Sequence, residues 1–225
     1  MSFDLRLPTI HPHAVGLLAA LAVASLAAPA QAQNLLENGS FEAGSWVNYA
    51  GGWARLTAGS TALQGWAVTG DPIAWSSPAN GEGVVAADGA RALDMTGMGN
   101  ENHAGGIAQS FATQAGATYR LSLMLGGVAA YGTPVRLLAD VAGVQQEFQL
   151  MPGAGNTWSE RTLDFVAQAA STTLTLGGVY GPAVYYIGLD DVSVAAVVPE
   201  PRSAALLLGG LLAAAALARR RGRAA

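Results

Sequence analysis

The sequence predicts an all-β domain, a sandwich or a barrel, and three observations lead to this fold class. Apolar residues alternate with polar ones in stretches of five to ten residues between Gly, Pro, Asn and Asp clusters. No stretch of ten or more residues in the central part of the chain keeps a 3.6-residue period, so few or no helices are expected. Many short strands joined by glycine-rich turns are typical of sandwiches and barrels.

The expected strands can be placed in order. They are 106–111, 119–125, 135–141, 147–150, 160–166, 172–176 and 184–194. In 119–125 the residues Tyr119, Leu121, Leu123 and Leu125 point to one face of the strand, because successive side chains alternate between faces. The segments 43–65 and 76–83 are rich in Gly, Ser and Ala and are expected to be loops. No internal repeat is visible.

The first 32 residues are expected to be a signal peptide. Arg6 lies in a short polar stretch, an apolar run follows from Ala14 to Ala28, and Ala30 and Ala32 form the small-residue pattern of a signal peptidase site. Cleavage is expected after Ala32.

The other end of the chain is a charged and apolar tail. Pro199, Glu200 and Pro201 form a stiff joint, because proline fixes φ and lacks a donor. The uncharged run 203–218 follows. Its 16 residues span about 24 Å as a helix, against about 30 Å for a bilayer core. The arginines Arg219, Arg220 and Arg221 come next and would hold this end on the cytoplasmic side.

This tail resembles the PEP-CTERM sorting signal of Gram-negative bacteria that make extracellular polysaccharide. The resemblance implies recognition and cleavage near the Pro-Glu-Pro motif by an exosortase, with a transient inner-membrane anchor. The alternative is a plain transmembrane anchor, for which the run is short. The expected organisation is a signal peptide in 1–32, a β-sandwich domain in 33–197 and a sorting signal in 198–225.

Charge and cysteine content restrict the partners of the central domain. Residues 33–198 hold five arginines, no lysine and thirteen acidic residues, a net charge of −8. Such an acidic domain should bind neither nucleic acid nor anionic membrane through charge, which leaves neutral sugars or cations. The chain has no Cys, so its core, or a metal, must stabilise it without disulfides.

Six motifs follow one another along the central domain. They are 34–42 (NLLENGSFE), 65–68 (GWAV), 88–95 (DGARALDM), 105–111 (GGIAQSF), 116–119 (GATY) and 188–194 (GLDDVSV). In this order they resemble the choice-of-anchor C family and related plant cell-wall domains of unknown function. The resemblance implies a galactose-binding-like jelly-roll sandwich, and it implies no activity, because such folds host many functions. The insertion after Glu42, with Trp46, Tyr49 and Trp53, has no counterpart in the family.

Catalytic residues are not evident. His103 is the one histidine outside the predicted signal peptide, and the sequence has neither a Gly-x-Ser-x-Gly elbow nor a cysteine nucleophile. A carboxylate pair could support glycoside hydrolysis, but thirteen acids make some pair inevitable. The domain is therefore expected to be non-enzymatic.

Calcium is a more specific use for the carboxylates. The resemblance to carbohydrate-binding sandwiches implies a structural Ca²⁺ shared by Glu42 and Asp190, with Asp191 and the Asn38 carbonyl as further ligands. Because Ca²⁺ takes six to eight oxygens, two acids alone do not define such a site. The alternative is that Asp190 and Asp191 only cap or twist the last strand.

Aromatic residues are the other candidates for binding. Trp46, Tyr49, Trp53 and Trp75 lie among Gly, Ser and Asn, and amphipathic rings suit stacking against sugars on a wet surface. Trp66 alternates with Val68 and is expected in the core. The alternative for each of the four is that it covers an end of the sandwich.

Together these features predict an exported surface or extracellular-matrix protein that associates with extracellular polysaccharide. The alternatives are a structural or adhesive surface protein without a defined ligand and, from a different class, a glycan-acting enzyme with an acid pair.

Overall fold

The computed structural model describes residues 33–81, 83–96, 105–128, 134–179, 181, 186–197 and 209–210. The predicted signal peptide, the Pro199-Glu200-Pro201 motif, the tail arginines and His103 lie outside these residues. Within the described part of the chain, no helix is long and apolar enough to cross a membrane.

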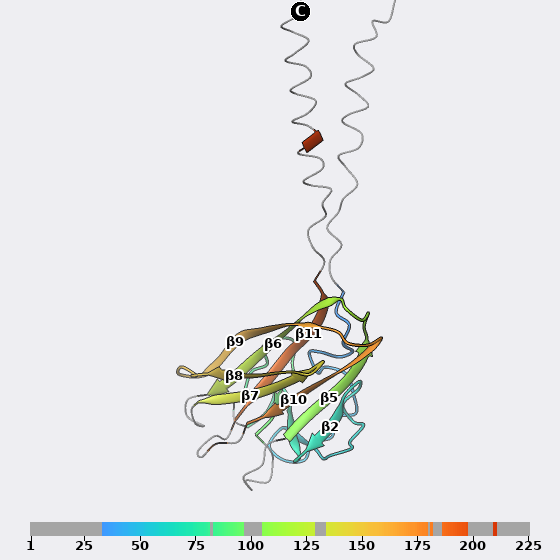
Figure 1. Cartoon of the computed structure of the whole chain (residues 1–225). Coiled ribbons are helices and arrows are strands. Elements are labelled where there is room, and N and C mark those ends of the chain that lie inside the picture. Colours follow the sequence, from blue (N-terminus) through green and yellow to red (C-terminus); the bar gives the residue numbers. More distant parts are fainter. Residues whose placement is uncertain are drawn as a thin grey trace, which may run out of the picture. The chain divides into compact units, whose positions relative to one another are not determined.

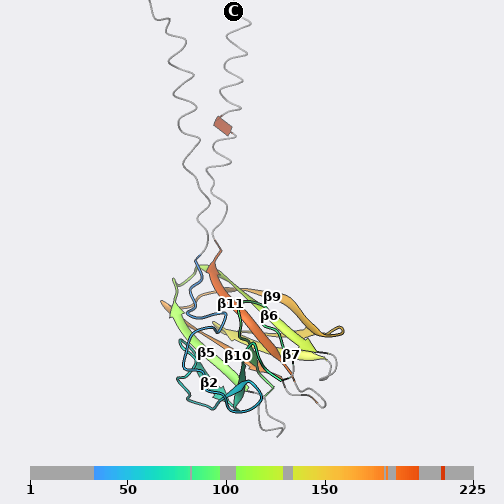
Figure 2. The ribbon, with the colours of Figure 1, turned by 180° about the vertical axis from the view of Figure 1, so that it is seen from behind.

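Within the described residues, eleven strands form two antiparallel sheets (Figures 1 and 2). The strands are β1 (Trp53–Leu56), β2 (Ala67–Gly70), β3 (Ile73–Ser76), β4 (Leu93–Asp94), β5 (Gly105–Ala112), β6 (Thr118–Val128), β7 (Val135–Val141), β8 (Val144–Leu150), β9 (Asn156–Val166), β10 (Ser171–Gly178) and β11 (Gly188–Ala196). One sheet has the order β1-β3-β4-β11-β6-β9 and the other β2-β5-β10-β7-β8. The predicted jelly-roll-like all-β sandwich is therefore the observed architecture.

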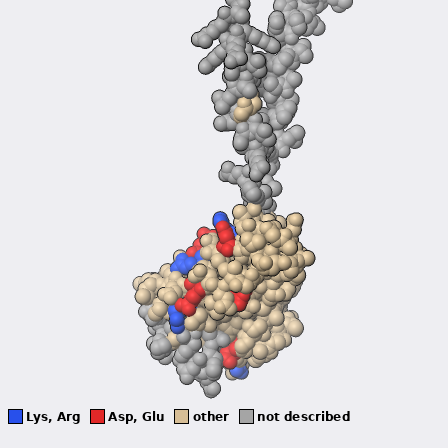
Figure 3. Space-filling view, in the orientation of Figure 1, with Lys and Arg blue, Asp and Glu red and all other residues tan. Residues whose placement is uncertain are grey.

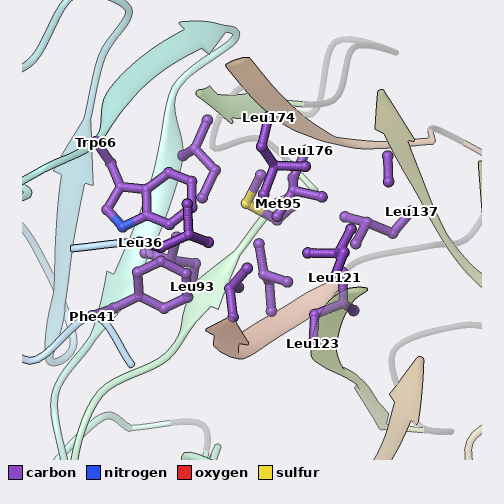
Figure 4. Packing of buried hydrophobic residues seen from close by; sticks show 14 of the residues in the cluster. Leu36, Phe41, Trp66, Leu93, Met95, Leu121, Leu123, Leu137, Leu174 and Leu176 are labelled. Carbon is purple, nitrogen blue, oxygen red and sulfur yellow. The ribbon is translucent and has the colours of Figure 1, made fainter. Parts of the chain in front are cut away.

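The core lies between the two sheets and follows from strand alternation. In β6, Tyr119, Leu121, Leu123 and Leu125 are all buried, as their spacing predicts. The facing sheet contributes apolar residues such as Leu137, Leu174 and Leu176, which meet them across the sandwich (Figure 4). At one end of this layer the rings of Phe41 and Trp66 lie 5.7 Å apart at 58° (Figure 4). The prediction that Trp66 is a core residue is confirmed.

The motif 34–42 starts no strand; it runs as irregular chain beside β11. The Leu35 N–H donates to the Val194 carbonyl (2.8 Å), while the Asn34 side chain accepts from the Val194 N–H and donates to the Val192 carbonyl. Both ends of the described sandwich therefore lie at the same pole (Figure 1).

Sequence reasoning located the later strands best. The predicted stretch 135–141 coincides with β7, and the other six predicted stretches overlap β5, β6, β8, β9, β10 and β11. It missed β2, β3 and β4 and treated 43–65 as loop throughout, although β1 lies within that segment. The loop predicted for 76–83 is confirmed over the described residues beyond Ser76, the last residue of β3.

The outer faces of the two sheets differ. β5 and β10 carry no charged residue, and this side of the surface is free of charge in Figure 3, whereas charged side chains gather over β7, β8 and β9. Outward residues of β5 and β10 are small or polar, such as Ser110 and Thr173, whose hydroxyls are 2.7 Å apart. The outer face of the six-stranded sheet is instead crossed by another segment of the chain, which defines the candidate site.

Candidate functional site

The outer face of the six-stranded sheet is crossed by residues 84–91, which we call the strap. Within this segment only Val84 is fully buried, and Val85 is 64 % exposed. Every hydrogen bond that the described structure gives to the backbone of residues 84–91 has a side chain as its partner, not another strand. The strap is thus held by a few side chains from distant parts of the sequence.

Two carboxylates hold the C-terminal part of the strap. Asp190 Oδ2 accepts from the N–H groups of Ala87 (2.7 Å) and Asp88 (2.9 Å). Glu42 Oε1 accepts from the N–H groups of Ala90 (2.7 Å) and Arg91 (2.8 Å). Hydrogen bonds to charged acceptors contribute about 1.5–3 kcal/mol, so two side chains separated by 148 positions in sequence together fix this turn.

Asp190 is fully buried where β11 departs from regular pairing. The register of β11 with β6 shifts between Asp190 and Ser193, and Asp191 takes a positive φ of 44°. The Asp191 N–H donates to Asp190 Oδ1 (2.7 Å). Burial raises the pKa of Asp190 to about 7, and its three N–H donors only partly oppose this. The irregular pairing at Asp190 and Asp191 agrees with the alternative that these two acids cap or twist the last strand.

The four predicted calcium ligands do not come together as one site. The Asn38 carbonyl already accepts from the Phe41 N–H and from Trp66 Nε1, and the Asn38 side chain bonds the backbone of Ala43 and Gln64. Asp191 is exposed. Among the described residues no group of three or more Asp, Glu, His or Cys side chains could hold a metal ion. Glu42 and Asp190 both contact the strap, but they do so by accepting hydrogen bonds from its backbone N–H groups.

The predicted sugar-stacking residues separate into buried and exposed ones. Trp75 is fully buried in β3 and donates from Nε1 to the Phe41 carbonyl (2.9 Å), which agrees with the alternative that it is covered rather than free to stack on a sugar. Trp53 is 7 % exposed and is covered as well. All four residues of β3 are buried, so that strand shows no alternation, whereas in β1 only Arg55 is exposed.

Trp46 and Tyr49 retain accessible surface. Trp46 is half-buried and donates to the Trp75 carbonyl (3.0 Å), and the Arg91 guanidinium lies 4.9 Å from its ring centroid. Tyr49 is 63 % exposed, with the Arg55 guanidinium 5.8 Å from its ring centroid. Each ring thus has a cationic neighbour, an arrangement that stabilises exposed aromatic groups by about 0.5–1 kcal/mol.

One aromatic residue was missed, Trp158 in β9. It is half-buried on the outer face of the six-stranded sheet, in register with Gly126 of β6 and beyond it Gly188 of β11. A Cβ added at Gly126 would lie 2.5 and 2.7 Å from Cε3 and Cη2 of the indole, and one at Gly188 would lie 2.9 Å from Cη2. The ring therefore rests on two bare stretches of backbone, and Trp158 Nε1 donates to the Val85 carbonyl of the strap (2.9 Å).

A second, small apolar cluster lies on the same outer face. Its buried members are Trp53, Ala74, Val84 and Tyr186, and Val128 packs against them. Two polar atoms within it are buried without a hydrogen-bond partner among the described residues, Trp53 Nε1 and the Tyr186 hydroxyl. Burial and then the charges of Asp94 and Asp190 raise the pKa of Tyr186 well above its ordinary value, so this hydroxyl stays protonated.

Two antiparallel sheets packed face to face, with a half-buried tryptophan and carboxylates on one outer face, define an all-β sandwich. The chain belongs to the family described as "Protein of unknown function (DUF642)", whose pattern matches residues 34–192. This confirms the resemblance to domains of unknown function; the choice-of-anchor C relationship stays a prediction.

Solved structures resemble the chain at low identity. TmCBM61 in complex with β-1,4-galactotriose has 17 % identity and a TM-score of 0.49, over 73 % of this chain and 99 % of that one. The CBM22-1 xylan-binding domain of Paenibacillus barcinonensis Xyn10C has 19 % identity and a TM-score of 0.41, over 76 % and 99 %. A family 16 carbohydrate-binding module has 15 % identity and a TM-score of 0.40, over 72 % and 99 %. No curated protein matches the chain. At these values the likeness says nothing about a ligand of this chain.

Proposed function

We propose that this protein is an exported, non-enzymatic surface or extracellular-matrix protein that associates with extracellular polysaccharide. The observation that carries the proposal is Trp158, an indole that rests on Gly126 and Gly188 and stays half-buried. A flat ring on a rigid sheet offers an apolar face to the CH side of a pyranose at little conformational cost. Carboxylates close by in the sheet, such as Glu160, supply acceptors for sugar hydroxyls.

Charge supports a neutral glycan over a charged one. The central domain has a net charge of −8, which would repel acidic polysaccharides. Two accessible aromatic rings have an arginine close to them: Tyr49 lies next to Arg55, and the half-buried Trp46 lies next to Arg91. A second stacking surface at Tyr49 therefore belongs to the proposal.

A glycan array probed with the purified protein tests this function. Binding to neutral polysaccharides, reduced at least tenfold by Trp158→Ala, is expected. Absence of binding to every glycan would favour the alternative, a structural or adhesive surface protein without a defined ligand. Release of reducing ends from a bound polysaccharide would instead support a glycan-acting enzyme.

Export and sorting are part of the proposal and have their own test. The Pro199-Glu200-Pro201 motif, the apolar run 203–218 and the arginines after it would direct the protein through signal peptidase and an exosortase to the cell surface. Replacement of Glu200 by Ala should leave an uncleaved, membrane-associated chain. Release of this variant at the wild-type rate would overturn the sorting proposal.

A structural Ca²⁺ at Glu42 and Asp190 is also proposed. Glu42 Oε2 and the Asp190 carboxylate oxygens would hold the ion. Backbone carbonyls and water would have to complete its coordination. Excess Ca²⁺ should raise the melting temperature and EDTA should lower it. A melting temperature that responds to neither would leave the strap as the sole role of these acids.

A further inference from the structure

The second apolar cluster combines two properties that conflict in a purely structural core. It excludes water, yet it contains the Trp53 indole N–H and the Tyr186 hydroxyl without partners among the described residues. An unsatisfied buried donor is costly, and more than nine-tenths of native buried polar groups avoid this state. Two such groups in one cluster of four buried residues call for a partner.

The cover of this cluster is the strap, through the side chain of Val84. Among the described residues Asn80 alone holds the Val84 backbone, and its side chain donates to the Val84 carbonyl (2.7 Å) and accepts from the Val84 N–H (2.9 Å). The rest of the strap is attached by single side chains at Asn156, Trp158, Asp190 and Glu42. Because no strand ladder includes these residues, the strap can detach without opening either sheet.

The sheet beneath the strap carries no side chain of its own at two neighbouring positions. Gly188 lies in register with Gly126 on one side and Asp94 on the other, so the sheet has no side chain between Trp158 and Asp94. A Cβ added at Gly188 would lie 2.7 Å from the Tyr186 hydroxyl and 2.9 Å from the Trp158 ring. An aromatic ring, a hydroxyl and a carboxylate thus surround one bare position of the sheet.

We propose that residues 84–91 are a displaceable strap over a saccharide site. When the strap is displaced, Trp53 Nε1 and the Tyr186 hydroxyl become accessible and donate hydrogen bonds to oxygens of a sugar that lies beside the Trp158 ring. This inference rests on the proposed carbohydrate binding and locates it. In the closed state neither donor has an acceptor among the described residues, and a bound sugar would supply one to each. The free energy recovered from these donors favours the open, bound state.

The matched substitutions are Tyr186→Phe and Trp53→Phe, which remove the donors and keep aromatic rings. In the closed protein Tyr186→Phe removes an unsatisfied group at nearly constant volume, so its melting temperature should stay unchanged or rise. Trp53→Phe also leaves a small cavity, so its melting temperature should fall. The affinity for sugar should fall about three- to tenfold for each, the value of one hydrogen bond. Tyr119→Phe is the control, because the Tyr119 hydroxyl accepts from the Gln114 N–H (2.8 Å) far from the strap. It should lower the melting temperature and leave affinity unchanged.

Affinities would be measured by calorimetry on the purified full chain with cellohexaose, xylohexaose and β-1,4-galactotriose. If the wild type binds and both variants bind equally well, the site beneath the strap is wrong although the proposed function stands. A wild type that binds none of these sugars, and no glycan on the array, overturns both. A Tyr186→Phe variant that loses melting temperature and keeps its affinity would show that this hydroxyl holds buried water only, which also overturns the inference.

Amide hydrogen exchange tests the motion separately. The N–H groups of Ala87, Asp88, Ala90 and Arg91 should exchange together and faster than those of β6 and β11, and saturating sugar should speed their exchange further. Protection of these four amides equal to that of the strands would refute the displaceable strap.

Discussion

Gly126→Ala tests how Trp158 is seated on the sheet. The new methyl group would lie 2.5 and 2.7 Å from two ring carbons, and closer still to Cζ3, whereas carbon atoms pack at about 3.5–4.0 Å. The indole must therefore move by roughly 1 Å or more, which breaks its hydrogen bond to the Val85 carbonyl. Overpacking costs about 1–3 kcal/mol and the lost hydrogen bond about 1 kcal/mol.

The expected loss in the free energy of unfolding is thus about 2–4 kcal/mol, a fall in melting temperature of about 4–16 °C for a domain of this size. Urea titration followed by tryptophan fluorescence measures it. Gly177→Ala is the control: Gly177 also lies within a strand, but a Cβ there meets nothing within 4 Å. This control should change stability by less than about 1 kcal/mol.

A double-mutant cycle separates the ring contact from general damage to β6. In a Trp158→Ala background the methyl group at Gly126 has no indole to displace, so Gly126→Ala should cost less than about 1 kcal/mol. An equal cost in both backgrounds would refute the seating of Trp158 on Gly126, as would wild-type stability of the single variant.

Three further predictions concern stability. Asp190 has a pKa of about 7 in the folded protein and about 3.9 in the unfolded chain, so the folded state binds more protons between these values. The free energy of unfolding should therefore fall as pH rises from about 4 to 7. Urea titrations of Asp190→Asn should show a smaller dependence on pH, and an unchanged dependence would contradict the prediction. Trp75→Ala should lower the free energy of unfolding by about 3–5 kcal/mol in chemical denaturation, because the ring is fully buried. Tyr49→Ala should change it by no more than about 0.5 kcal/mol, because Tyr49 is exposed. Equal losses would contradict these two burial assignments. Arg120→Ala should cost less than about 1 kcal/mol, because its bidentate pair with Asp164 is exposed; a larger loss in the same assay would contradict this.

Strands with one covered and one open face were predictable from sequence. The alternation in 119–125 and 172–176 places their apolar residues in the core, as observed in β6 and β10. β3 spans Ile73–Ser76 with all four residues buried, since Val84 of the strap packs with Ala74 on the side that alternation would leave polar. The sequence left Trp75 open between sugar stacking and coverage of a sandwich end, and in the structure it lies in the main core with Ile73.

The site was harder to predict because its contacts join distant segments. The hydrogen bonds from the strap to Asp190 and Glu42 span 102, 103, 48 and 49 residues, and no local pattern encodes them. Trp158 did leave a signal in the sequence. Glycine within a strand, as at Gly126, often marks close approach of another group, and β6 has no other apparent reason to contain one.

The position of the chain ends has a consequence for how the domain can be rearranged. Leu35 is hydrogen-bonded to Val194, so a linker of a few residues can join the two natural ends of the sandwich. The turn at Ala142 and Gly143, both with positive φ, connects β7 to β8 at residues that pair directly with each other, Val141 and Val144. A circular permutant that is closed at the first place and opened at the second keeps every strand pair of the fold. In such a protein the proposed saccharide site would be unchanged, while the predicted leader and tail would be attached at another corner of the sandwich.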